Sequence, residues 1–226
     1  ASRLDAFDWT RANVLDYGCN VGNFYLDAAG RIPANRHIGV DILEASIALA
    51  RQRHPDTRWI WLNRYHPSYN KHGVPDLALE LDVKLDLIVA YSVFSHSDLD
   101  ELRAALRSFE QLLNPGGTVL FSLWEDWHLP FWLDFLDEGG ATARDEHPTD
   151  WTSRLYLVDR LGFIADGVLP AGHLDFLDVF YQRDFMLREF PGLTIPKGSA
   201  AAATNGFPLQ TIYAWRKPGV ERVAGI

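Results

Sequence analysis

The chain of 226 residues contains one cysteine, Cys19. A single thiol excludes an internal disulfide and a metal site built from several cysteines, so a packed apolar core must hold the fold. A membrane-spanning helix needs about twenty uninterrupted apolar residues, and no stretch of the chain comes close to that length. The N-terminus also lacks the basic and then apolar pattern of a signal peptide. We therefore expect a single domain over 1–226 that works in the cytoplasm and does not contact a membrane.

Positive charge is scarce as well. There are 21 Lys and Arg residues against 30 Asp and Glu, which gives a net charge of -9. Such a chain repels a phosphate backbone, so a large nucleic-acid interface is not expected. Aromatic residues make up 13% of the sequence and include eight Trp. They favour aromatic pockets for a small molecule, and tryptophans buried in the core are the alternative.

Short apolar runs alternate with amphipathic segments in the first half of the chain. The runs that predict buried strands are 13–17, 37–41, 58–62, 86–91 and 118–123. The segments between them that predict helices are 45–53 and 98–113. In the second helix, leucines and Phe109 recur at steps of three and four residues, and "NPGG" ends the pattern. Strand and helix in repetition indicate parallel strands joined by right-handed crossovers.

The second half departs from this rhythm. We expect a helix over 153–161 that leads into a strand in "GFIADGVL", and a last strand in "PLQTIYAWRK". Two irregular tracts, 124–151 and 170–208, interrupt these elements, and the second contains a helix around 174–190. Tracts of this length in a compact domain are usually lids or substrate walls, with disorder as the alternative.

The stretch "NVLDYGCNVGNF" places two glycines directly after the first strand. A strand that turns through glycines into a helix lets the backbone approach a ligand, as nucleotide and nucleoside sites require. The dinucleotide fingerprint G-x-G-x-x-G is absent, because the segment from Gly18 reads "GCNVGN". A nicotinamide dehydrogenase is therefore disfavoured.

These residues resemble the class I S-adenosylmethionine-dependent methyltransferases. "VLDYGCNVG" is similar to the first motif of that family, with Asn20 in place of its middle glycine, and Asp41 closes the second strand about twenty residues later. "LDLIVAYSVFSHSDLDEL" and "LLNPGGTVLFSL" resemble the fourth strand, the next helix and the fifth strand. The similarity covers about residues 12–123, so 1–123 is expected to be the cofactor-binding half.

The resemblance implies an α/β, Rossmann-like doubly wound fold. Its sheet would be mostly parallel and seven-stranded, with helices on both faces and insertions after strands 3, 5 and 6. The insertions 124–151 and 170–208 would lie on the substrate side. About a dozen residues precede the first strand. The sequence leaves open whether the chain is a trimmed form or whether the cofactor's cover comes from the insertions or from a partner subunit, as in a homodimer.

The resemblance also implies S-adenosylmethionine as cofactor, with S-adenosylhomocysteine as product. The residues expected to bind it are Asp16, Gly18, Asn20, Gly22, Asp41, Ile42, Asn63 and Tyr91. Asp41 would accept both ribose hydroxyls, and its alternative role is to cap the next helix. Asn63 would face the adenine amine or serve only as a turn residue. Cys19 is expected to be a small packing residue.

Methyl transfer needs alignment, exclusion of water and, for some acceptors, removal of a proton. His96, in "FSHSD" after the fourth strand, is the candidate base, and packing of its loop is the alternative. The candidate acceptor-binding residues are Tyr65, His66, Tyr69, Trp124, Glu125 and His128. His66, His72, Glu125, Asp126 and His128 show no helical metal-ligand spacing, so no metal is expected.

The acidic charge and the aromatic tracts favour a small, partly aromatic acceptor that is methylated on O or N in secondary metabolism. Two alternatives stay open. The "GCN" turn also looks like that of methyltransferases acting on RNA 5′-phosphates, so an RNA end or a nucleotide is one alternative acceptor. The other is a binding module that has the fold and holds the cofactor without transfer.

Overall fold

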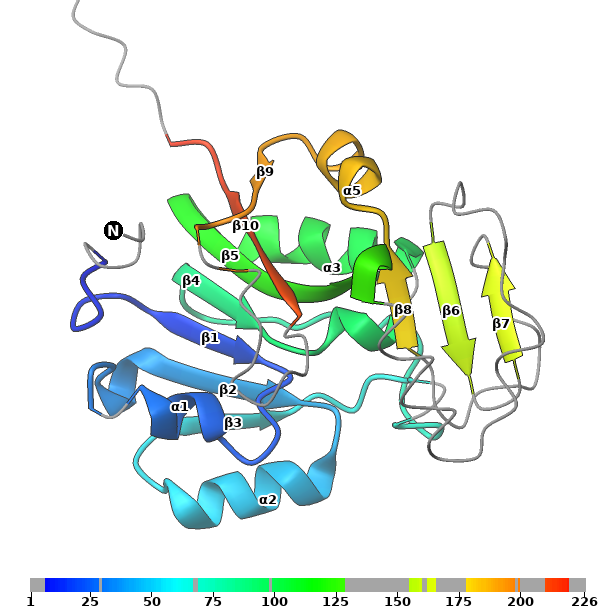
Figure 1. The fold of residues 1–226 in the computed structure, drawn as a ribbon. Helices are drawn as coiled ribbons and strands as arrows, with labels where there is room; N and C mark the ends of the chain where they lie inside the picture. The colour runs from blue at the N-terminus through cyan, green and yellow to red at the C-terminus, as the bar shows by residue number, and fades with distance from the viewer. Residues whose placement is uncertain are drawn as a thin grey trace, which may run out of the picture.

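The computed structural model describes residues 7–28, 30–66, 69–97, 99–128, 155–159, 162–165, 178–197, 199 and 210–219. Five parallel strands form the centre of the sheet in the order β3-β2-β1-β4-β5 (Figure 1). Their bounds are β1 (Val14–Tyr17), β2 (His37–Asp41), β3 (Arg58–Trp61), β4 (Leu85–Ala90) and β5 (Leu113–Glu125). The predicted parallel strands are confirmed, but β3 is an edge strand that exposes Arg58 and Trp61 and is not buried as predicted.

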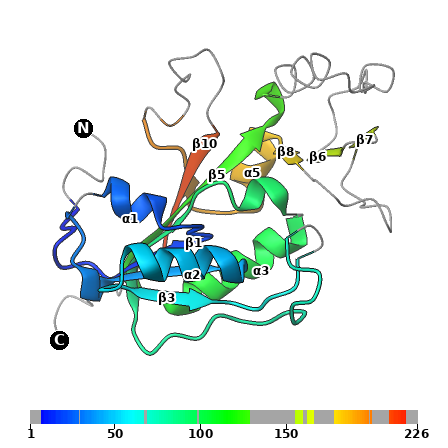
Figure 2. The same cartoon turned by 90° about the horizontal axis from the view of Figure 1, so that it is seen from below.

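The remaining strands are shorter and extend the sheet beyond β5. β10 (Thr211–Arg216) runs antiparallel to β5 and carries β9 (Leu193–Thr194) on its other edge. β8 (Asp178–Tyr181) pairs with the end of β5, and β6 (Leu155–Asp159) and β7 (Gly162–Ala165) follow it. The views in Figures 1 and 2 agree that β6 and β7 lie far from β3. The described strands thus form a ten-stranded sheet, where the sequence predicted seven strands.

Helices cover both faces of the parallel strands, as predicted. The α-helices are α1 (Asn23–Asp27), α2 (Glu44–Arg53), α3 (Leu99–Leu112) and α5 (Arg183–Glu189). The 3-10 helices are η1 (Ala34–Arg36), η2 (Phe94–His96) and η3 (Asp126–His128). Leu15 belongs to the apolar cluster beneath α3, while its neighbour Val14 joins a cluster on the α1 face. Successive side chains of a strand point to opposite faces, so β1 is buried on both sides.

Two predictions for the second half were wrong. The segment expected to be a helix over 153–161 contains β6, which pairs with β7 and β8 on its two edges. Its run Leu-Tyr-Leu-Val is short, fully apolar and rich in strand formers, so it fits a strand flanked by two others. The helix expected around 174–190 begins only at Arg183, because the buried Val179, Phe180 and Tyr181 belong to β8.

The "NPGG" segment ends α3 at Leu112 as predicted, but β5 already begins at Leu113 and includes these residues. A shift in register between Leu85 and Leu87 marks where β4 accommodates them. Of the two predicted substrate-side insertions, residues 129–151, 170–177, 198 and 200–208 lie outside the described residues. The expected insertion after the third strand is present as a loop held by two isolated bridges, Arg64 with Val74 and His66 with Asn70.

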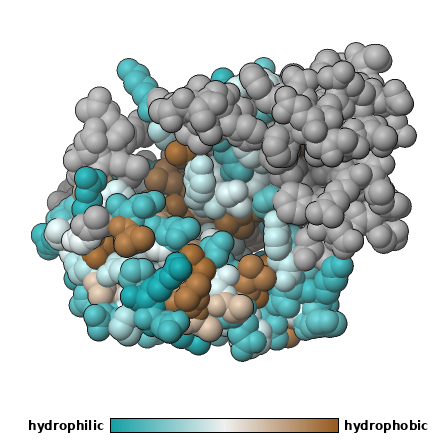
Figure 3. Space-filling view, turned by 60° about the horizontal axis from the view of Figure 1, so that its bottom comes forward, coloured by the Kyte–Doolittle hydropathy of each residue, from teal (hydrophilic) through white to brown (hydrophobic). Residues whose placement is uncertain are grey.

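The face drawn in Figure 3 is mostly hydrophilic where it is described, and its apolar residues stand in small separate groups. None of the helices in the described part of the chain has both the length and the apolar character needed to cross a bilayer.

The position of the site is determined by the edge of the sheet at which β1, β2 and β4 end. Ligands of open α/β sheets bind in the crevice at this edge.

Candidate functional site

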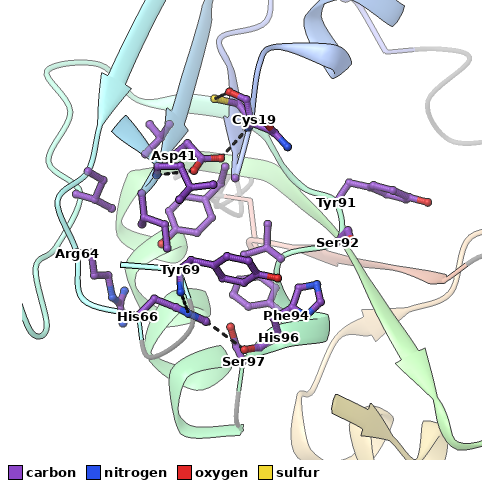
Figure 4. A pocket seen from close by; sticks show the side chains of 18 of the residues that line it. Cys19, Asp41, Arg64, His66, Tyr69, Tyr91, Ser92, Phe94, His96 and Ser97 are labelled. Atoms are coloured by element: carbon purple, nitrogen blue, oxygen red, sulfur yellow. Dashed lines mark hydrogen bonds between the residues drawn. The ribbon is translucent and has the colours of Figure 1, made fainter. Parts of the chain in front are cut away.

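A cavity of about 440 Å³ lies at the carboxyl ends of β1, β2 and β4 (Figure 4). Ten of the residues selected from the sequence line it. They are Asp16, Gly18, Asn20, Asp41, Ile42, Tyr65, His66, Tyr69, Tyr91 and His96. The residues selected from the sequence that do not line it are Gly22, Asn63, Trp124, Glu125 and His128.

The glycine turn forms one wall of the cavity. Gly18, Asn20 and Gly22 have φ angles of 76°, 49° and 86°, a left-handed region that side chains disfavour. The N–H group of Gly18 donates to the Val40 carbonyl at 2.8 Å, which ties the turn to β2. A β-carbon on Gly18 would lie 2.4 Å from Cγ2 of Val93. Backbone conformation and packing therefore both require glycine at position 18.

Asp41 fastens this turn to the end of β2. Its Oδ2 accepts the N–H of Asn20 at 2.7 Å, and its Oδ1 accepts the N–H of Leu43 at 2.8 Å. The carboxylate is 8% exposed, and α2 begins with no side-chain cap. The helix-capping alternative for Asp41 is therefore not observed. Each carboxylate oxygen can accept a further hydrogen bond, so ribose hydroxyls remain possible partners.

Asp16 is the second buried acid of the cavity. It is 4% exposed, and its buried Oδ2 has no hydrogen-bond partner among the residues that the structure describes. Burial, and then the nearby charge of Asp41, raise the pKa of Asp16 to about 7. An unpartnered carboxyl beside another acid suits a ligand that brings positive charge. The expected cofactor carries a sulfonium and an amino group, and these positive charges suit the two neighbouring carboxyl groups.

His66 holds the loop after β3 against η2. Its Nδ1 accepts the N–H of Tyr69 at 3.2 Å, so its Nε2 carries the proton and donates to the carbonyl of His96 at 3.2 Å. Burial lowers the pKa of His66 to about 4. The imidazole is therefore neutral at physiological pH, with both ring nitrogens already bonded to backbone.

His96 and three tyrosines give the cavity an aromatic entrance. The half-buried ring of His96 meets that of Tyr69 edge-on, with centroids 5.6 Å apart. Tyr65, Tyr69 and Tyr91 are 43%, 37% and 51% exposed. Figure 4 shows the rings of Tyr69 and His96 beside each other in the cavity, whereas the Tyr91 ring points away from them.

Glu125 lies elsewhere, in a buried junction at the end of β5. It is fully buried, and Arg183 donates to both of its oxygens at 2.9 and 2.6 Å. The Tyr213 hydroxyl and the Trp127 indole also donate to it. Burial alone would raise the pKa of Glu125, but these donors and the Arg183 charge hold it below its usual range. A carboxylate saturated in this way has a clear structural role.

The other selected residues outside the cavity also make contacts that stabilise the fold. His128 Nδ1 accepts the N–H of Glu125 at 2.9 Å, and Trp124 stacks on Phe180. Asn63 Oδ1 accepts the side-chain amide of Asn70 at 3.1 Å, as expected of a turn residue. The buried Gly22 leaves no room for a side chain beside Trp59, 2.7 Å from where its β-carbon would lie.

Cys19 packs with Ile47, Ala50 and Trp59 in a small apolar cluster and also borders the cavity. Residues that the sequence reasoning did not select line the cavity too, among them Arg64, Ser92 and Glu101. Among these three, Ser92 differs in its backbone, which has a φ of 57°. This conformation could not be read from the sequence. Within the described residues, no group of three or more His, Cys, Asp or Glu side chains is placed to hold a metal ion.

A model of the methyltransferase domain matches residues 15–119 of the chain. No curated protein sequence matches it. The N-methyltransferase NodS from Bradyrhizobium japonicum WM9, solved with S-adenosyl-L-homocysteine, is similar in structure with a TM-score of 0.53. It is 17% identical, and the match covers 92% of this chain and 78% of NodS.

Two further solved structures have a TM-score of 0.54. One is a SAM-dependent methyltransferase from Methanosarcina mazei, 15% identical, with 93% of this chain and 95% of that chain covered. The other is the Burkholderia thailandensis 1,6-didemethyltoxoflavin-N1-methyltransferase, 18% identical, with 92% and 71% covered. At these identities the likeness concerns the fold, which is the Rossmann-like methyltransferase fold that the sequence predicted.

Proposed function

We propose that the chain is a class I S-adenosylmethionine-dependent methyltransferase that methylates an O or N atom of a small, partly aromatic molecule. The observation that carries the proposal is the single cavity that contains Asp16, Asp41, the glycine turn and His96. S-adenosylmethionine supplies an activated methyl group there. The similar structures described above include the N-methyltransferase NodS and the 1,6-didemethyltoxoflavin-N1-methyltransferase, and the latter acts on a small aromatic molecule.

The roles of the residues follow from their places. The glycine turn and Asp41 hold the cofactor, with Asp41 accepting ribose hydroxyls in addition to the two backbone N–H groups. The unpartnered Asp16 oxygen faces the cofactor's positive charge. Ile42, which follows Asp41 in the cavity wall, packs against the adenosine.

On the acceptor side, Tyr65 and Tyr69 supply aromatic surface, and the ring nitrogen of His96 removes a proton from the acceptor as the methyl group arrives. Removal of a proton in the transition state by a positioned base is worth roughly a hundredfold or more in rate. His66 orients the loop that carries Tyr65 and Tyr69, and it takes no proton itself because both its nitrogens are engaged.

The proposal is tested in two steps. Isothermal titration with S-adenosylmethionine and S-adenosylhomocysteine should give saturable binding with one site per chain. Formation of S-adenosylhomocysteine is then followed over a panel of phenols, aromatic amines, nucleotides and RNA 5′ ends. Turnover with phenols or amines supports the proposal. Turnover confined to nucleotides or RNA, or cofactor binding with no turnover on any of them, would replace it by one of the alternative functions.

A further inference from the structure

Three polar side chains close a ring of hydrogen bonds beside the cavity. The N–H of Ser92 donates to Oγ of Ser122 at 2.7 Å, and the Ser122 hydroxyl donates to Oε1 of Gln210 at 2.6 Å. Nε2 of Gln210 then donates back to Oγ of Ser92 at 3.1 Å. Ser122 is fully buried and Gln210 is 5% exposed. The ring therefore joins the end of β4 to β5 and to the residue before β10.

The direction of these bonds determines where each hydrogen goes. The Ser122 hydrogen is used within the ring, whereas Ser92 Oγ only accepts. A hydroxyl that accepts one bond still has its hydrogen to donate. Among the described residues that hydrogen meets no acceptor, and Ser92 is an exposed residue of the cavity lining. The ring thus leaves one donor for a ligand.

The ring also holds Ser92 in an unfavourable backbone conformation. Its φ is 57°, in the left-handed region, and strained residues of this kind persist only where their surroundings hold them. The next residue, Val93, is the one that a β-carbon on Gly18 would strike. The strained turn therefore packs directly on the glycine turn, and Ser92 lies beside the part of the cavity that the cofactor would occupy (Figure 4).

We infer that the Ser92 hydroxyl donates a hydrogen bond to the carboxylate of the cofactor's amino-acid part, and that Gln210 is the positioning residue that orients it. This inference rests on the proposed function. A carboxylate is disfavoured next to Asp16 and Asp41, so it needs a donor away from them. Arg64 also lines the cavity, but Glu101 faces it at 3.8 Å and offsets its charge.

Two variants separate this role from a role in stability alone. Ser92→Gly removes the hydroxyl, keeps the N–H that binds Ser122 and tolerates the left-handed backbone. Its melting temperature should stay close to that of the parent, because relief of the strained backbone offsets the lost hydrogen bond from Gln210. Gln210→Met keeps the volume but deprives the buried Ser122 hydroxyl of its acceptor, so its melting temperature should fall. Both should bind S-adenosylhomocysteine about tenfold more weakly. The double variant should be no weaker in binding than Ser92→Gly.

The comparison ligand is 5′-deoxy-5′-methylthioadenosine, which lacks the amino-acid part. Isothermal titration should give it the same affinity for the parent and both variants. Equal weakening of both ligands would mean that the turn has merely been distorted, and would overturn the inference. Unchanged binding of S-adenosylhomocysteine would overturn it too, while leaving the proposed function intact. A parent protein that binds no S-adenosylhomocysteine would remove both.

Discussion

Oδ2 of Asp41 accepts the backbone N–H of Asn20 at 2.7 Å, across the gap between the end of β2 and the glycine turn. The acid that the sequence indicated for the ribose is thus already part of the cavity wall. Its other oxygen accepts the N–H of Leu43. Asp41 therefore shapes the turn before any ligand arrives, and its loss should affect the shape of the site as well as direct contacts.

Replacing Asp41 with Ala should weaken S-adenosylmethionine binding at least tenfold, because hydrogen bonds to a charged group are worth about 1.5 to 3 kcal/mol each. Isothermal titration measures the change. The exposed Asp56→Ala, which lies outside the cavity, is the matched control and should bind like the parent. An Asp41→Ala protein of parental affinity would refute the assignment of the ribose site.

Gly18→Ala should both destabilise the protein and weaken cofactor binding, because its φ is 76° and its β-carbon would press on Val93. Gly30 offers a matched control, since it has the same φ of 76° with nothing within 4 Å of a β-carbon. Gly30→Ala should lower the free energy of unfolding only by the cost of a side chain in the left-handed backbone conformation, on the order of 1 kcal/mol. Thermal unfolding of the two variants, followed by cofactor titration, gives the comparison. Equal losses at the two positions would show that the Val93 contact is unimportant.

Because Asp16 is buried, the free energy of unfolding should depend on pH, and the direction of this dependence can be worked out. Its pKa is about 7 in the folded protein against 3.8 for a free carboxyl. Between these values the unfolded chain loses the proton and the folded chain keeps it. The free energy of unfolding should therefore fall as pH rises from about 4 to about 7. Thermal unfolding without ligand should show this fall in the parent and a weaker one in Asp16→Asn.

The same carboxyl should link cofactor binding to pH. A cation favours the ionised acid, so binding expels the proton at pH values below about 7. The affinity for S-adenosylmethionine should then rise as pH increases through about 7, and titrations across this range should show no such rise in Asp16→Asn. A flat profile in the parent would mean that the Asp16 carboxyl does not meet the ligand's charge.

His96→Gln should lower kcat by roughly a hundredfold or more, with little change in cofactor affinity, if His96 takes the acceptor's proton. His72→Gln is the control, because His72 is exposed and outside the cavity. Steady-state kinetics with the acceptor found in the panel separates the cases. A change confined to KM would assign His96 to acceptor binding. Full turnover would indicate an acceptor that is nucleophilic without a base.

Arg183→Met should lower the free energy of unfolding by about 2 to 3 kcal/mol, because the buried Glu125 carboxylate loses its ion pair. The expected loss lies below the usual range for buried pairs, since the Arg183 side chain is 43% exposed. Arg58→Met removes an exposed pair with Asp82 and should leave the free energy of unfolding close to that of the parent. Denaturant unfolding measures both. A strong effect on acceptor KM with unchanged stability would restore Glu125 to the acceptor site.

The part of the site that could be predicted follows from the parallel sheet. Polar residues at the ends of parallel strands meet at one edge of the sheet, and Asp16, Asp41 and Tyr91, which the family resemblance selected, all line the cavity there. The short run in β6 could not be assigned, because a few apolar residues fit a strand or a buried helix equally well. Its pairing with β7 and β8 decided the matter.

The roles of the remaining polar residues depend on partners that no local pattern reveals. Glu125 is bound by Arg183, 58 residues away, and by Tyr213, 88 residues away, so its position after a strand suggested a ligand that it does not need. His66 likewise looked like an acceptor-binding residue. Its tautomer is set by the N–H of Tyr69 and the carbonyl of His96, which only the folded loop brings within reach.

The junction around Glu125 also bears on how the chain folds during synthesis. β5 is made early, but the Tyr213 hydroxyl that binds Glu125 and the β10 edge that pairs with β5 come from residues translated some ninety positions later. Until they leave the ribosome, the Glu125 carboxylate lacks one of its donors and β5 has an open edge, which is prone to wrong pairing. The nascent chain is therefore expected to need protection by chaperones until β10 emerges, and to reach its native stability only then.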